Sequence, residues 1–128
     1  MLNQTGVRKE SATVPNQILF NVQNQVSVGI VVAQSVAPTA NAEGKRIVKA
    51  GTPVTGNLRA RTTAFTAATA TAVQGVLLHD VDVTKGAANA TLLIWGFVNI
   101  NRLDTATRAL ITTQIETLLN GKITFLND

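Results

Sequence analysis

The sequence contains no cysteine and no tyrosine, and it has a single histidine and a single tryptophan. The lack of cysteine excludes disulfide bonds and thiolate metal sites, so packing must stabilise this chain of 128 residues, a length that suits one domain. Charged residues make up only 14% of it, against about 25% in typical globular proteins. A weakly charged composition rich in Thr and Val fits a protein covered by partners, and it fits a β-rich monomer equally well.

Side chains able to carry chemistry are few. The only histidine, His79, precedes Asp80 and lies near Asp82. In a strand the two aspartates would share one face while His79 points to the other, so the three would not converge on one metal ion. We interpret both aspartates as strand-end acids that bond the backbone or neighbouring side chains. Because the sequence also lacks a nucleophile elbow and a phosphate-binding glycine loop, we predict no enzyme, no cofactor and no metal site.

Long apolar segments are missing as well. Residues 1–17 are polar, unlike a signal peptide, and the longest apolar run, residues 29–33, is far too short to cross a bilayer. We therefore expect no membrane partner and synthesis in a cytoplasm.

The net charge of +4 is concentrated in residues 1–61, which carry seven Lys and Arg against two acids. A basic half can bind nucleic acid, but no aromatic residues alternate with these charges to stack on bases, which favours an acidic protein surface as partner.

Alternation of apolar and polar residues predicts a chain made mainly of strands. The signal is strongest in residues 73–83 and 91–101, which flank a short glycine-containing loop and therefore predict a hairpin. Residues 60–72 are mostly Ala and Thr, and we expect a loop there with Phe65 as its one large anchor. Further strands are expected at 26–33, 45–50 and 123–126.

A helix is predicted over residues 105–119. Asp104 is placed to accept hydrogen bonds from the first turn, and a glycine at 121 is a typical C-terminal stop. Apolar residues recur on one face of this helix at helical spacing: Leu103, Ala106, Leu110, Ile111, Ile115, Leu118 and Leu119. The expected fold class is α+β, mainly β: a compact antiparallel or mixed β domain over residues 18–128 with a C-terminal helix, preceded by an extended N-terminal arm over residues 1–17.

The single tryptophan, Trp95, shares an apolar run with Phe97. Its neighbours favour a place in the core, whereas the enrichment of tryptophan at interfaces allows a second interpretation, an anchor between subunits. The same two interpretations apply to Leu110 and Ile115 on the predicted helix, where the core is again favoured. These four residues are the candidates for core or subunit-interface packing.

Several motifs follow one another in order between residues 48 and 126. They are Val48-Lys49-Ala50-Gly51-Thr52-Pro53-Val54, Gly75 to Thr84 with Asp80-Val81-Asp82, the turn at Lys85-Gly86, the apolar strand 92–99 around Gly96, and Gly121-Lys122-Ile123-Thr124-Phe125-Leu126. This series, which covers roughly three fifths of the chain, resembles the phage lambda-type head decoration protein family.

The resemblance implies a homotrimer on the outside of a tailed-phage capsid, where it clamps the major capsid protein of the expanded shell. It implies a virion protein made in the host cytoplasm, with an N-terminal arm that adds a strand to a capsid sheet. The arm residues expected to contact the capsid are Thr5, Val7, Arg8, Lys9 and Val14. Two other functions stay open: a basic nucleic-acid-binding accessory protein, and another virion subunit of the tail or fibre.

Overall fold

A computed structural model of the chain describes residues 17–19, 23 and 25–127. Its strands are β1 (Val26–Val32), β2 (Ile47–Val48), β3 (Pro53–Thr55), β4 (Thr66–Ala67), β5 (Gly75–Leu77), β6 (Val81–Asp82), β7 (Ala88–Asn99) and β8 (Ile123–Leu126). Its helices are α1 (Thr105–Leu110) and α2 (Thr113–Leu118), with short 3-10 turns η1 (Gln34–Val36) and η2 (Ile100–Arg102). The predicted fold class, α+β and mainly β, is confirmed.

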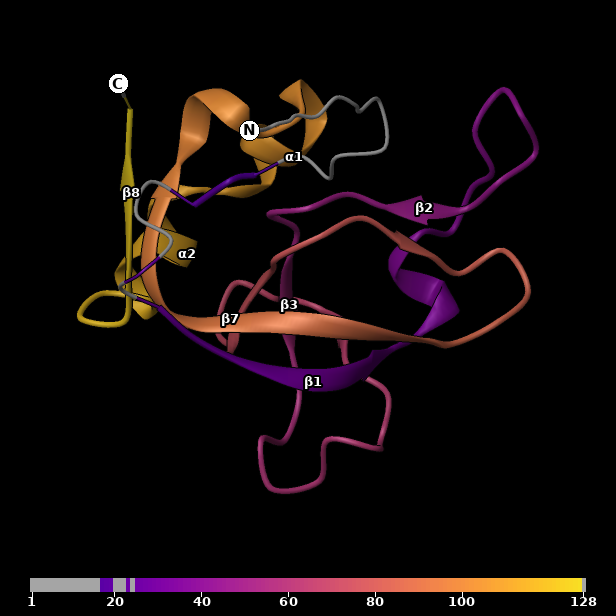
Figure 1. Ribbon diagram of the computed structural model, residues 1–128, viewed down its shortest axis with the longest axis horizontal. Helices are drawn as coiled ribbons and strands as arrows, with labels where there is room; N and C mark the ends of the chain where they lie inside the picture. Colours follow the sequence, from indigo (N-terminus) through magenta and orange to yellow (C-terminus); the bar gives the residue numbers. More distant parts are fainter. Residues whose placement is uncertain (1–16, 20–22, 24, 128) are drawn as a thin grey trace, which may run out of the picture.

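Five strands of a six-stranded sheet curl toward a barrel, and the sixth, β8, pairs with β7. The order of the five is β1, β7, β5, β3 and β4, and each neighbouring pair is antiparallel. Phe65, just before β4, then meets Val32 of β1 in a parallel bridge. The two outer strands of the sheet therefore approach each other along a seam that is closed at the C-terminal end of β1. Figure 1 shows β1 and β7 side by side along the length of the domain.

The predicted hairpin is correct for its two strands and wrong for its connection. β5 pairs antiparallel with β7, with Val76 opposite Leu93. Between them the chain leaves this sheet, and β6 pairs with β2 instead. One cause is the side chain of Asp80, whose Oδ1 accepts a hydrogen bond from Ala50 N–H at 2.7 Å and fixes the start of β6 next to the segment that follows β2. The expected last strand, β8, is confirmed and lies parallel to the far end of β7.

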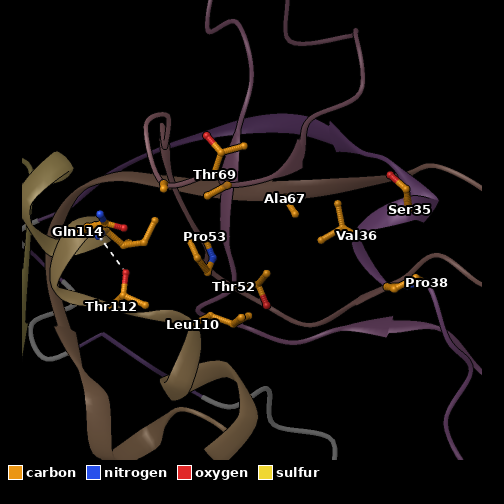
Figure 2. Close-up of a pocket in the computed structure, with 13 residues that line it drawn as sticks. Ser35, Val36, Pro38, Thr52, Pro53, Ala67, Thr69, Leu110, Thr112 and Gln114 are labelled. Carbon is orange, nitrogen blue, oxygen red and sulfur yellow. Dashed lines mark hydrogen bonds between the residues drawn. The ribbon is translucent and has the colours of Figure 1, made fainter.

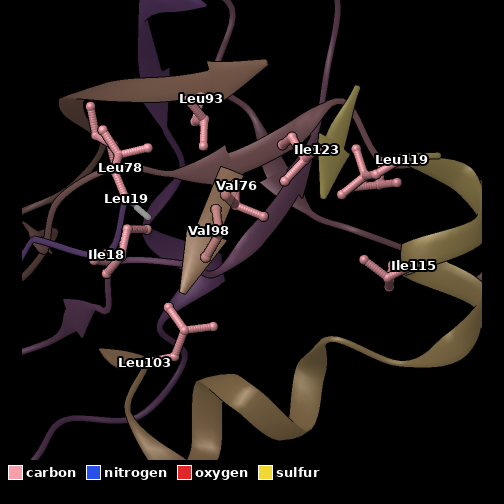
Figure 3. Packing of buried hydrophobic residues seen from close by; sticks show 12 residues of the cluster. Ile18, Leu19, Val76, Leu78, Leu93, Val98, Leu103, Ile115, Leu119 and Ile123 are labelled. Atoms are coloured by element: carbon pink, nitrogen blue, oxygen red, sulfur yellow. The ribbon is translucent and has the colours of Figure 1, made fainter. Parts of the chain in front are cut away.

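The central strands separate two apolar cores. Because side chains alternate along a strand, Val76 and Leu93 face the first core while Leu77 and Leu92 face the second. The first core joins the sheet to the C-terminal helices (Figure 3), and its members include Ile18, Leu19, Val98, Leu103, Ile115, Leu119 and Ile123. The second core lies inside the curl of the sheet and is centred on the fully buried Phe65, the anchor expected from the sequence.

The single helix predicted over residues 105–119 is wrong, since α1 and α2 are separated by a break at Thr112. The break has a local cause: Thr112 Oγ1 accepts a hydrogen bond from Ile115 N–H at 3.3 Å and caps the second helix. The two helices do not bury one continuous apolar face: α1 buries Thr107, whereas Ala106, Leu110 and Leu118 of the predicted face are exposed. The buried members of that face are Leu103, Ile115 and Leu119.

The two helix starts differ in a way that predicts a difference in stability. Asp104 takes the N-cap position of α1, but its side chain makes no capping hydrogen bond, contrary to the expectation from sequence. Thr112→Ala should therefore lower the free energy of unfolding by about 1 kcal/mol, while Asp104→Ala should change it by less than about 0.5 kcal/mol. Urea unfolding of both variants measures this, and equal losses would contradict the role of the Thr112 cap.

Candidate interaction surfaces

Trp95 lies on the surface, 42% exposed, so its interpretation as a core residue is wrong. The cause is an irregularity in the pairing of β1 with β7. Val26 is opposite Trp95, but the next residue, Ser27, is opposite Leu93, and Ile94 between them has no partner. This is the arrangement of a β-bulge, in which two residues of one strand oppose one residue of the other. As a result two consecutive residues, Ile94 and Trp95, line the same hollow.

This surface, which we name the Trp95 hollow, has a volume of about 590 Å³ and is lined by Val26, Leu58, Gln74, Ile94, Trp95 and Lys122. Val26 and Leu58 are themselves exposed, at 47% and 37%, so large apolar side chains gather here in contact with water. The half-buried Phe97 meets Trp95 edge to face, with ring centroids 6.0 Å apart and planes inclined by 70°. Such aromatic pairs favour this geometry, and the two predicted aromatic candidates thus lie together.

A second hollow, of about 460 Å³, lies between η1, β3, β4 and the two helices (Figure 2). Both Leu110 and Ile115 line it, and none of the lining residues that the structure describes is charged. Leu110 is 48% exposed, whereas Ile115 is buried and belongs to the first core. Of these two predicted candidates, therefore, only Leu110 is exposed enough to contact a partner, and Ile115 mainly stabilises the fold.

Asp80 and Asp82 bond the backbone and neighbouring side chains, as expected from the sequence. Asp80 accepts the hydrogen bond from Ala50 described above, and its Oδ2 lies 3.6 Å from Lys49 Nζ. Asp82 Oδ1 accepts from the hydroxyl of Thr84 and from Thr84 N–H, the latter at 2.9 Å. Within the described part of the chain, no group of three or more His, Cys, Asp or Glu side chains could hold a metal ion.

The pKa of Asp82 is lowered from its ordinary value near 3.8, first by the hydroxyl of Thr84 and then by its N–H. A lowered pKa means that these bonds favour the ionised carboxylate, so their contribution is present at neutral pH and is lost as the pH falls through the lowered pKa. Thr84→Ala should raise this pKa toward its ordinary value, as measured by NMR titration of the Asp82 carboxyl carbon. Lys85→Ala, which removes the weakest of the causes that lower this pKa, should raise it less, and the reverse order would contradict this assignment.

The predicted capsid-contact residues of the arm, Thr5, Val7, Arg8, Lys9 and Val14, lie outside the described residues. In the stretches that the structure does describe, no helix has both the length and the apolar character needed to cross a membrane.

Of the residues that line the Trp95 hollow, only Trp95 was predicted as a site residue, and the exposed Val26 and Leu58 were not. Val26 fits the alternation of an ordinary strand. Its exposed position accompanies the irregular pairing at Ile94, and no sequence pattern signals such an irregularity. Leu58 had a usable signal, because it is a lone large apolar residue between Asn57 and Arg59 in a polar loop.

No family model, no curated protein and no solved structure matches this chain, so its function is inferred from these surfaces and from its sequence.

Proposed function

We propose that this chain is a structural protein of a virion, which assembles as a homotrimer, binds the major capsid protein on the outside of a tailed-phage shell, and stabilises the expanded shell. The observation that carries the proposal is the Trp95 hollow, an exposed apolar surface on a domain with few charges. The sequence resemblance to head decoration proteins supplies the kind of particle and the trimer. The hollow supplies a surface through which subunits can meet.

The Trp95 hollow has the physical features of a protein contact. Tryptophan is enriched among the residues that dominate binding energy, typically in pockets from which a partner excludes water. Val26 and Leu58 are also exposed here, and complete burial of such a side chain is worth about 1.5–3 kcal/mol. Among the described residues, Lys122 is the one charged residue that lines the hollow, so little charge desolvation opposes association.

The N-terminal segment starts from a fixed point on the domain. Ile18 and Leu19 are buried in the first core, Leu19 forms a bridge with Val98, and Asn99 N–H donates to Ile18 O at 2.8 Å. Residues 18 and 19 are therefore fixed beside β7. Strand addition obtains its affinity from main-chain hydrogen bonds, and three tethered segments in one trimer would bind a shell with greater avidity than one.

Trp95→Ala tests the subunit contact. Light scattering should give the mass of three chains for the wild type and of one chain for the variant. The free energy of unfolding should change by less than about 1 kcal/mol, because Trp95 lies largely outside the cores. The matched control is Leu118→Ala, which alters another exposed apolar side chain that does not line the hollow and should leave the trimer intact. A trimer that survives Trp95→Ala would show that the subunits meet elsewhere.

Co-sedimentation with expanded, empty capsids tests shell binding. We expect saturable binding that is lost when residues 2–14 are deleted, and binding that survives this deletion would remove the arm from the proposal. If the protein does not bind shells but binds DNA with an affinity that falls steeply with salt, it is the nucleic-acid-binding accessory protein instead. Immunogold labelling of tails or fibres rather than heads would identify it as another virion subunit.

A further inference from the structure

The outer edge of β1 is closed at one end and open at the other. Near its C-terminal end, Val31 N–H donates to Arg61 O at 3.2 Å and Val31 O accepts from Phe65 N–H at 2.7 Å. Toward the N-terminal end, no described residue accepts a hydrogen bond from the outward backbone N–H groups of Ser27 and Gly29, and none donates to Ser27 O. The seam of the curled sheet is therefore closed along only half of β1.

The hydrogen-bond pattern identifies the open groups. In an antiparallel ladder, residues whose N–H and C=O face the neighbouring strand alternate with residues whose groups face away. Since Val31 bonds away from β7, Gly29 and Ser27 also direct their backbone groups outward. The bonding of β7 supports this orientation, because Thr91, opposite Gly29, directs its carbonyl away from β1 and accepts from Leu78 N–H at 2.9 Å. The open groups are thus the N–H of Gly29 and both backbone groups of Ser27.

β1 lacks two features that usually protect an exposed edge, namely charged residues and proline. Its sequence, VSVGIVV, contains no charge and no proline, and an unprotected edge of this kind is a template for another strand. The exposed side chain of Arg61 covers only Gly29 O, with its Nη1 at 3.3 Å. A Cβ added at Gly29 would meet nothing within 4 Å, so the face of the sheet is uncovered at this residue.

The hollow beside this edge is basic. It has a volume of about 460 Å³ and is lined by residues 29–31, 59–62 and 89–90, of which Arg59 and Arg61 are the charged ones. An incoming strand that donates to Gly29 O would release the Arg61 guanidinium, which could then pair with a carboxylate. The charge therefore favours an acidic segment. It disfavours the N-terminal segment of this chain, which carries Arg8 and Lys9 side by side.

We propose that the open half of the β1 edge is a docking site for an extended acidic segment of a partner protein. The segment adds as a strand along Ser27 to Gly29 and places carboxylates next to Arg59 and Arg61. Main-chain hydrogen bonds supply the affinity, and the two arginines supply the preference for acidic sequences. The site goes beyond the virion assignment and does not depend on it or on the Trp95 contact.

A displayed library of random peptides of about nine residues, a common strand length, tests the proposal. The selected binders should be net acidic, and a synthetic copy of the best one should bind wild type and Ser27→Ala alike. Ser27→Pro should bind it about tenfold more weakly, because proline removes the outward N–H while the ladder to β7 stays intact. A selection without binders, basic or neutral binders, or equal affinity for Ser27→Pro would overturn the proposal.

Amide hydrogen exchange of the unaltered protein gives a second readout. The saturating peptide should slow exchange at Ser27 and Gly29 by about tenfold or more, with little change at Val28 and Ile30, whose N–H groups already face β7. Unchanged rates at Ser27 and Gly29 would overturn the proposal. Dissociation of a dimer of this chain by Ser27→Pro would also overturn it, because the occupant would then be a second copy. Better protection of the edge by a peptide of residues 2–14 than by the acidic peptide would overturn it too, because the occupant would then be the chain's own arm.

Discussion

Phe65→Ala is expected to lower the free energy of unfolding by about 3–5 kcal/mol, the usual cost of truncating a buried phenylalanine. Phe65 has no exposed surface and is the largest fully buried side chain in the described part of the protein. Its backbone also closes the seam of the sheet, donating to Val31 O and accepting from Ala33 N–H at 2.9 Å. The substitution would therefore leave a cavity in the second core and weaken the packing where the seam closes against β1.

Urea unfolding measures this loss against two further variants. Thr63→Ala alters an exposed residue of the same loop and should cost less than about 0.5 kcal/mol. Phe65→Leu refills much of the volume and should recover at least half of the stability lost in Phe65→Ala. If Phe65→Ala cost no more than Thr63→Ala, Phe65 would not be the anchor of the second core.

The parts of the fold that sequence predicted are those governed by local chemistry. Phe65 could be predicted as an anchor because it is the one large residue among Ala and Thr. β8 could be predicted because residues with high strand propensity follow a turn that contains glycine. The connection between β5 and β7 could not be predicted in the same way. It depends on Asp80 bonding Ala50, thirty residues earlier in the chain, and neither residue type signals the other.

The errors at the candidate site share a physical cause, which is a single residue that interrupts a regular element. Thr112 restarts the helix and Ile94 interrupts the ladder of β7. Helical periodicity placed Leu110 inside, and the apolar neighbours of Trp95 favoured the core for that residue, but both are exposed. The open edge of β1 is further still from prediction, because it depends on which distant segment lies beside the strand and how far that segment extends.

Gly75→Ala is expected to lower the free energy of unfolding by about 3 kcal/mol or more, at the upper end of the cost of overpacking. A Cβ at Gly75 would lie 2.2 Å from Leu93 O and 3.1 Å from Leu93 C, which are backbone atoms of β7. No change of rotamer relieves such a clash. β5 would have to move away from β7 at the pair of Val76 with Leu93, where the two cores meet.

Gly29→Ala is the matched control, since Gly29 also lies in a strand next to β7 but has open space where the new Cβ would point. It should leave the stability unchanged or raise it by up to about 1 kcal/mol, because alanine loses less conformational freedom than glycine on folding. In thermal unfolding this means a fall in Tm of about 10–15 °C for Gly75→Ala and almost none for Gly29→Ala. Equal Tm values would show that β5 can move away from β7 at little cost, and the close backbone contact would then not determine how the two cores are separated.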